Sequence, residues 1–241
     1  MPESRWPRTS RFAIAALAAI VTISVGHVAV RADRPSTTEA QALAETFLGW
    51  PRADAADLVA GMRRVDRVGS RMTVRGLKTD RAINYKMRAT WLTPDVIRAT
   101  ARALQLDERL SPDEARRLVA EADAAADTVF FVELDPHEGS GVIPLDWIAL
   151  LQPRGLPAGD AGAVRGTVSP KLRDVRALNG LFKRDYAYDA FWVAFTLTPA
   201  ERTALFGPQA TDVELVVNIR GQEGVVSWPI PGSVRTKLSP Q

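Results

Sequence analysis

The chain has no cysteine and two histidines, His27 and His137, among its 241 residues. The absence of cysteine excludes disulfide bonds, thiol catalysis and cysteine-ligated zinc. A metal site with several histidine ligands is excluded too, and a Ser-His-Asp triad would depend on His137, because His27 lies in the N-terminal apolar run. Phosphate-binding glycine loops of the G-x-G-x-x-G and Walker types are also absent. The sequence therefore contains no motif that identifies a reaction, and we expect no cofactor.

The chain from Asp33 onward, which we call the body, also lacks a net charge. The whole chain has 31 Lys and Arg residues against 28 Asp and Glu residues. Residues 1–32 hold four of the basic residues and one of the acidic residues, which leaves 27 of each from Asp33 onward. A neutral body is poorly suited to neutralising phosphates, so we expect no binding to nucleic acid.

The charges are nevertheless unevenly distributed along the sequence. Residues 52–88 carry ten basic and four acidic side chains, whereas residues 101–150 carry eleven acidic and four basic ones. This pattern predicts two oppositely charged faces of one domain that meet or flank each other. The alternative is a basic surface that faces anionic lipid or polymer near a membrane.

A long apolar run stands near the N-terminus. Arginines at positions 5, 8 and 11 precede an apolar block over residues 12–25, and small residues at 30 and 32 permit cleavage after Ala32. Residues 12–30 would also serve as an uncleaved membrane anchor, because a spanning helix needs about 20 apolar residues. We therefore expect residues 1–32 to be a signal peptide or an N-terminal membrane anchor. The protein is expected to be periplasmic, extracellular or anchored to the outer face of the cytoplasmic membrane, with membrane contact only through residues 12–30.

Residues 33–70 predict a helical N-terminal segment. Apolar residues follow the helical period over 40–48, and a weaker helical pattern runs from Leu58 to about Val68. We expect these helices to pack on the body of the protein. An exposed apolar face that included Leu43, Phe47 and Leu58 would instead favour an assembly factor that contacts another membrane protein.

Residues 71–241 predict seven or eight β-strands. The period of two is clear at 83–91, and residues 213–219 and 226–230 form a predicted hairpin. Further strands are predicted at 129–134, 143–151, 164–168 and 191–197. For residues 172–178 the pattern leaves open a helical turn or an irregular edge.

Two helices are predicted between the strands at 83–91 and 129–134. Thr93-Pro94 and Ser111-Pro112 each place a cap residue before a proline, and Glu114 completes a capping box with Ser111. They predict a helical hairpin at about 94–126. The predicted fold class is mainly β with helical additions (α+β): an immunoglobulin-like two-sheet β-sandwich that carries an inserted helical hairpin.

Residues 133–141 hold the densest set of polar functional groups in the chain. Glu133 and Asp135 would share one face of a strand, and His137 and Glu138 follow in a polar turn. Asp135, His137 and Glu138 are the predicted metal ligands, because this donor set suits a divalent cation. The alternative is a solvated turn in which proline, glycine and serine set the backbone geometry.

A second cluster, at residues 182–189, combines aromatic and acidic side chains. Tyr186 and Tyr188 are predicted to share one face of an extended segment, with Asp185 and Asp189 close by. Exposed rings beside carboxylates suit sugar or peptide binding, because a ring offers an apolar platform and an acid orients hydroxyl groups. These four residues are the predicted ligand-binding residues. The alternative is that both tyrosines cover an edge of the core.

Together these features predict an exported, non-enzymatic β-sandwich protein that binds a protein partner or an envelope polymer. The alternative is a periplasmic or extracellular hydrolase that uses acidic residues around 133–146 or 185–189, where two carboxylates would flank the scissile bond. A hydrolase would need a pocket that joins these acids. A sugar-binding protein would expose Tyr186 and Tyr188 in a shallow groove.

Overall fold

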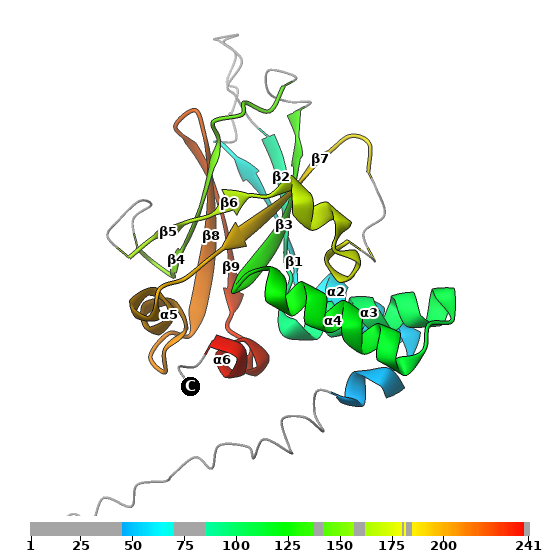
Figure 1. Cartoon of the computed structure of the whole chain (residues 1–241). Coiled ribbons are helices and arrows are strands. Elements are labelled where there is room, and N and C mark those ends of the chain that lie inside the picture. Colours follow the sequence, from blue (N-terminus) through cyan, green and yellow to red (C-terminus); the bar gives the residue numbers. More distant parts are fainter. Residues whose placement is uncertain are drawn as a thin grey trace, which may run out of the picture.

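The computed structural model describes residues 45–69, 85–136, 142–156, 162–179, 181 and 185–238. The chain is mixed α+β, with two antiparallel sheets and a group of helices packed beside them (Figure 1). The predicted leader and Leu43 lie outside the described residues. Within the described ranges, no helix is long and apolar enough to cross a membrane.

The first sheet has five strands in the order β1-β2-β3-β7-β6. Their bounds are Arg63–Val68 for β1, Tyr85–Trp91 for β2, Thr128–Asp135 for β3, Asp189–Phe195 for β7 and Thr167–Val168 for β6. Every neighbouring pair is antiparallel. In β2 the residues Tyr85, Met87, Ala89 and Trp91 are buried, so the alternation predicted over this stretch is confirmed.

The second sheet has four strands in the order β5-β4-β8-β9. The strands are β5 (Val164–Arg165), β4 (Ile148–Pro153), β8 (Asp212–Ile219) and β9 (Gln222–Pro229). The predicted hairpin is confirmed as β8 and β9, which pair from Asp212 with Pro229 to Ile219 with Gln222. Strand β9 lies at the edge of this sheet, where the proline at its end costs no ladder hydrogen bond.

Helices α3 (Pro94–Glu108) and α4 (Pro112–Ala125) follow β2 and precede β3. Thr93 accepts a hydrogen bond from the Val96 amide, and Ser111 and Glu114 form the predicted capping box. A second box, Thr198 with Glu201, starts α5 (Pro199–Phe206). The remaining helical elements are η1 (Thr46–Gly49), α2 (Arg52–Gly61), η3 (Pro170–Asp174), η4 (Arg176–Leu178) and α6 (Gly232–Leu238).

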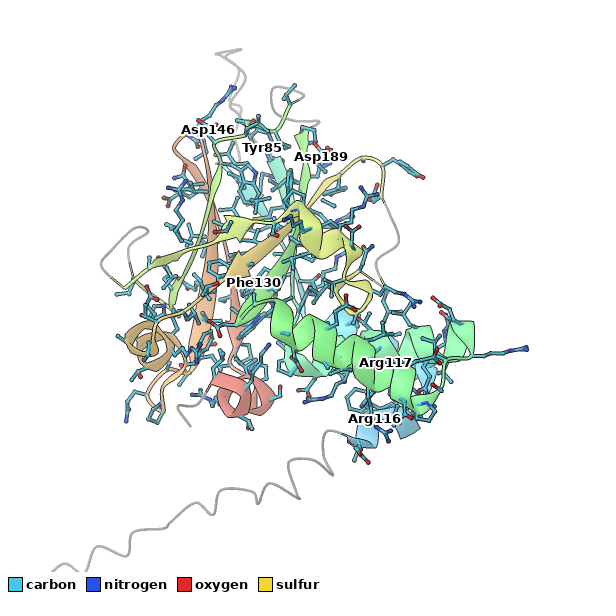
Figure 2. All side chains as sticks on the ribbon, viewed as in Figure 1. Tyr85, Arg116, Arg117, Phe130, Asp146 and Asp189 are labelled. Carbon is cyan, nitrogen blue, oxygen red and sulfur yellow. The ribbon has the colours of Figure 1, made fainter. Side chains whose placement is uncertain are left out.

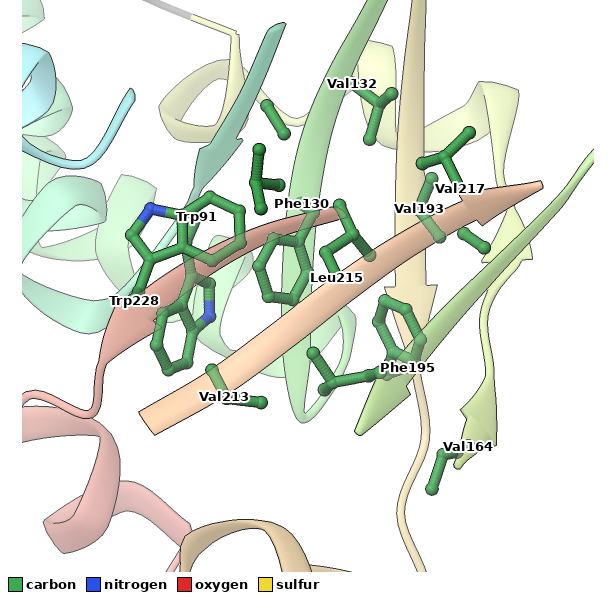
Figure 3. Close-up of a cluster of buried hydrophobic side chains, with 14 of the residues drawn as sticks. Trp91, Phe130, Val132, Val164, Val193, Phe195, Val213, Leu215, Val217 and Trp228 are labelled. Atoms are coloured by element: carbon green, nitrogen blue, oxygen red, sulfur yellow. The ribbon is translucent and has the colours of Figure 1, made fainter. Parts of the chain in front are cut away.

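The main hydrophobic core lies between the two sheets, with Phe130 near its centre (Figure 2). Trp91, Phe195 and Trp228 surround Phe130, with ring centroids 5.4, 5.6 and 5.3 Å from the Phe130 ring (Figure 3). The indole N–H groups of Trp91 and Trp228 both have a partner: Trp91 donates to Thr128 Oγ1 at 2.6 Å and Trp228 donates to the Met62 carbonyl at 2.7 Å. Both tryptophans therefore belong to the core.

A second core lies between the outer face of the five-stranded sheet and the helices. Val129, Phe131 and Trp192 of the sheet are buried there against α2, α3, α4 and η4. Phe47 is 2% exposed in this core, and Leu58 is half-buried against it. The segment 46–61 therefore packs on the body, as expected, and does not present these two side chains as an exposed apolar face.

The two sheets are also joined at both edges. Strands β5 and β6 are parts of one stretch, 164–168, which passes from one sheet to the other at Gly166. On the opposite side β1 lies against β9: the Gly69 amide donates to the Glu223 carbonyl, and the Val225 amide donates to the Asp66 carboxylate, both at 3.0 Å. A backbone hydrogen bond and a side-chain hydrogen bond thus join the β1 edge of the first sheet to the β9 edge of the second.

Two local predictions differ from the structure, one open alternative is settled, and one helix was missed. The helical pattern predicted up to Val68 ends at Gly61, and residues 63–68 instead form β1, which pairs with β2. The strand predicted at 143–151 begins only at Ile148. Residues 170–178 form two short 3-10 helices, which settles the alternative that the sequence left open. Helix α6 was not predicted at all.

Candidate functional site

The outer face of the five-stranded sheet has two halves. One half is covered by the helices, and the other carries charged side chains from β1, β2 and β3. Lys86 lies opposite Asp135 in the β2–β3 register, and Arg88 lies opposite Glu133. Glu133 and Asp135 therefore share one strand face, as predicted. We call Arg63, Lys86, Arg88, Glu133 and Asp135 the charged half-face.

Both carboxylates of the charged half-face are buried beside cations. Glu133 and Asp135 are 4% and 5% exposed. Arg63 Nη2 lies 2.7 Å from Glu133 Oε2, Arg88 Nη1 lies 4.0 Å from Glu133 Oε1, and Lys86 Nζ lies 3.5 Å from Asp135 Oδ2. Because an isolated buried carboxylate loses its hydration, the nearby cations offset the cost of burying these two side chains.

These ion pairs explain the uneven charge of the sequence. The cations come from the basic stretch 52–88 and the acids come from the acidic stretch 101–150. Arg52 of α2 pairs with Asp107 of α3 in the same way. The prediction that the two stretches meet is confirmed.

Arg88 also contacts the turn at residues 185–188. Its Nη1 donates to Asp185 Oδ2 at 2.9 Å, and its guanidinium carbon lies 3.8 Å from the centroid of the Tyr188 ring. The turn is closed by the Tyr188 amide, which donates to the Asp185 carbonyl at 3.0 Å, and by the Ala187 amide, which donates to Asp185 Oδ1 at 3.2 Å. One arginine thus binds the sheet and the turn together.

The predicted extended segment is therefore wrong for residues 185–188. The backbone turns because the short Asp185 side chain binds an amide two residues on, which competes with an extended strand. As a result, the two tyrosines have different environments. Tyr186 is 86% exposed, whereas Tyr188 is half-buried beneath Arg88. Asp189 is exposed at the start of β7, opposite Leu134.

The electrostatics of the turn favour a permanently charged pair. The hydrogen bond from Arg88, followed by the bond from the Ala187 amide, lowers the pKa of Asp185 below its ordinary value. Burial tends to lower the pKa of Arg88, but its hydrogen bond to Asp185 and the nearby negative charges outweigh burial and raise that pKa. Both groups are therefore ionised at neutral pH.

The predicted metal ligands are only partly described. Asp135 is buried in β3 and lies beside Lys86, while His137 and Glu138 lie outside the described residues. Among the residues that are described, no three His, Cys, Asp or Glu side chains are grouped as a metal site would require. Asp146, another acid of the predicted hydrolytic range, is exposed in the turn before β4 (Figure 2).

Sequence reasoning missed Arg63 and Arg88, the two arginines that organise this surface. The alternating pattern at 83–91 already placed Lys86 and Arg88 on the outer face, which was the available signal. Their partners were not visible, because the pairing of β2 with β3 brings together residues that are far apart in the sequence.

No protein-family model, no curated protein and no solved structure matches this chain. Its function must therefore be inferred from the geometry of its own residues.

Proposed function

We propose that this is an exported, non-enzymatic binding protein that recognises an envelope polymer or a protein partner through the turn at 185–188. The observation that carries the proposal is Tyr186, a large aromatic side chain that is 86% exposed on a turn attached to the sheet. An exposed ring suits stacking on the apolar face of a sugar. Because the turn that carries the ring is held by Asp185 and Arg88, its backbone loses less conformational entropy when a ligand binds, which favours affinity.

The predicted ligand-binding residues take separate roles in this proposal. Tyr186 is the platform, and the exposed Asp189 is the acid that would orient ligand hydroxyl groups. Asp185 and Tyr188 hold the turn, because their polar atoms and ring are engaged with Arg88 and the Ala187 amide. Among the possible ligands, a glycan polymer fits a flat aromatic platform best.

We also propose that the two sheets pack as a β-sandwich, which is the level at which the fold resembles an immunoglobulin domain. Inner side chains of both sheets share one core, which supports two packed layers. The strand order β1-β2-β3-β7-β6 differs from the immunoglobulin order, so the proposal covers the layered architecture and not the topology.

Export is proposed from the sequence pattern of residues 1–32. N-terminal sequencing of the protein recovered from envelope fractions distinguishes the two versions of this proposal. A mature start at Asp33 means that the leader is cleaved, and an intact leader in the membrane pellet means that it is an anchor.

The alternative of a hydrolase is less well supported. A general acid needs a raised pKa, whereas the pKa of Asp185 is lowered by Arg88. Glu133 and Asp135 lie beneath Arg63, Arg88 and Lys86, so their oxygens are directed at protein cations.

Co-sedimentation with insoluble peptidoglycan, with cellulose as an unrelated glycan, tests the binding proposal. We expect Tyr186→Ala to raise the apparent Kd by about fivefold through loss of the stacked ring, and Tyr186→Phe to bind like the wild type. Leu106→Ala is the matched control, because Leu106 is an exposed apolar side chain of α3 in the helical layer. Equal binding by Tyr186→Ala and the wild type contradicts the proposed role of Tyr186. A wild type that binds neither glycan contradicts the proposal that the ligand is a glycan polymer.

A further inference from the structure

Arg88 joins two parts of the chain that are 97 residues apart. It extends from β2, binds the carboxylate of Asp185 and covers the ring of Tyr188. The two hydrogen bonds within the turn link residues 185, 187 and 188 to one another, and so they close the turn without attaching it to the sheet. The contacts of Arg88 supply an attachment to the sheet.

We infer that Arg88 is the positioning residue of the proposed binding site, holding the turn at 185–188 against β2 so that Tyr186 is presented to solvent in one orientation. This inference rests on the proposed function. In this arrangement Arg88 orients the turn that carries Tyr186, and the Tyr186 ring contacts the ligand.

The chemistry of an arginine suits this role better than that of a lysine. A guanidinium group is planar, so it can cover the Tyr188 ring, 3.8 Å from the ring centroid, while one of its N–H groups donates to Asp185. A lysine ammonium group would keep the charge and lose the flat face.

Glu133 holds Arg88 from the side of the sheet. Its carboxylate is buried directly opposite Arg88 in the register and lies 4.0 Å from Arg88 Nη1. Arg63 binds the other carboxylate oxygen of Glu133 at 2.7 Å, so Glu133 is itself fixed. The guanidinium group therefore lies between a buried acid of the sheet and an acid of the turn.

The three tyrosines of the chain allow a direct test, since each lies in a different environment. Tyr85 is fully buried, Tyr188 is half-buried beneath Arg88, and Tyr186 is 86% exposed. Nitration of the full chain by tetranitromethane, mapped by peptide mass spectrometry, gives a separate rate for each ring. In the wild type we expect Tyr186 to react fastest, Tyr188 more slowly and Tyr85 not at all.

Removal of the attachment is expected to change the rate of Tyr188 alone. We expect Arg88→Ala and Asp185→Ala each to raise the Tyr188 rate by about fivefold, the effect of one cation–π contact or exposed ion pair. Arg88→Lys should give an intermediate rate. Nitration of the buried Tyr85 would reveal unfolding of Arg88→Ala. In that case Asp185→Ala still tests the attachment, because it changes only a partly exposed side chain.

Arg154→Ala is the matched control. It removes an exposed arginine whose ion pairs are with Asp212 and Glu214 of the four-stranded sheet. We expect its Tyr188 rate to equal that of the wild type. Equal acceleration of Tyr188 in Arg154→Ala and Arg88→Ala would overturn the inference, because it would indicate general loosening, and so would a Tyr188 rate unaffected by Arg88→Ala.

Peptidoglycan binding by the same variants separates this inference from the proposed function. Weaker binding by Tyr186→Ala and Arg88→Ala, with partial recovery in Arg88→Lys, supports both. If Tyr186→Ala weakens binding and Arg88→Ala does not, the proposed function stands and the positioning role is overturned. If the wild type binds no glycan while Tyr188 labelling responds as expected, the attachment is supported and the proposed glycan ligand is overturned.

Discussion

At the scale of a single residue, the carboxylate of Asp185 makes two kinds of contact. It closes the turn, and it also binds Arg88 of the sheet. Its Oδ1 accepts from the Ala187 amide and its Oδ2 accepts from Arg88. Protonation of this carboxyl group weakens both bonds, since a neutral acid is a poorer acceptor and has no charge to offer Arg88. The turn is therefore expected to respond to pH.

The direction of this response follows from the lowered pKa of Asp185. Because that pKa is lower in the attached turn than in a released one, the attachment is complete above about pH 4, the ordinary range of aspartate. It is lost as the pH falls through the lowered value. We expect the Tyr188 signal in the NMR spectrum of a ¹³C-tyrosine-labelled sample to be constant from pH 8 to 5 and to move toward that of a released ring only below about pH 4.

Asp185→Asn is the control for this titration. Asparagine cannot ionise, so its Tyr188 signal should be independent of pH over the same acid range. A Tyr188 transition centred near pH 6 in the wild type would assign the response to another group and contradict the prediction.

Single residues also show the limit of sequence reasoning. Alternation correctly placed Glu133 and Asp135 on one strand face, since side-chain direction is a local property of a strand. The partners Arg88 and Arg63 could not be predicted, because they depend on the register of β2 against β3 and β1. The turn at 185–188 was missed for a different reason: a side-chain hydrogen bond overrode an alternating pattern.

At the scale of elements, the predictions succeeded where the signal was local and failed where it was not. The caps predicted at Thr93 and Ser111 each combine a hydroxyl with a proline, Ser111 also has a glutamate three residues on, and each cap starts a helix. Strand β1 has a weak pattern of its own, and its conformation is fixed by pairing with β2 and by contact with β9. Such contacts cannot be read from a single stretch of sequence.

Helix α6 was missed because it is short and is stabilised by other helices. Ser233 donates to Asp95 of α3 at 2.6 Å, and Lys237 lies 3.1 Å from Asp123 of α4. Arg235 donates to the carbonyls of Phe206 and Gly207 at 3.2 and 2.7 Å, and to the Ala210 carbonyl. Arg235 thereby satisfies carbonyl groups at the C-terminal end of α5, which a helix leaves unpaired.

We expect Arg235→Ala to lower the free energy of unfolding by about 2 kcal/mol, because it removes charge-assisted hydrogen bonds from partly buried carbonyls. Urea denaturation followed by tryptophan fluorescence measures the change. Lys171→Ala, which removes an exposed charge from η3, should change stability by less than about 0.5 kcal/mol. Equal stability of Arg235→Ala and the wild type would show that α6 is not held to α5 by this residue.

At the scale of the whole molecule, each place where the two sheets are joined contains a glycine in close contact. A Cβ atom at position 166 would lie 2.5 Å from Val193 Cγ1 and 2.7 Å from Phe195 Cζ, both side chains of the core. A Cβ atom at position 224 would lie 2.9 Å from the Arg67 carbonyl oxygen. These separations are shorter than van der Waals contact, so a larger residue requires core side chains to shift at position 166 and the β1 backbone to shift at position 224.

We therefore expect Gly166→Ala and Gly224→Ala each to lower the free energy of unfolding by about 1–3 kcal/mol, the usual cost of overpacking. Gly61→Ala is the matched control, because a Cβ atom there meets nothing within 4 Å and position 61 belongs to α2. In a helix this change is expected to be neutral or to stabilise by up to about 1 kcal/mol. Urea midpoints for the three variants measure the difference. Equal midpoints would mean that the two edges are not closely packed, whereas a loss confined to positions 166 and 224 identifies close packing at both edges as a determinant of stability.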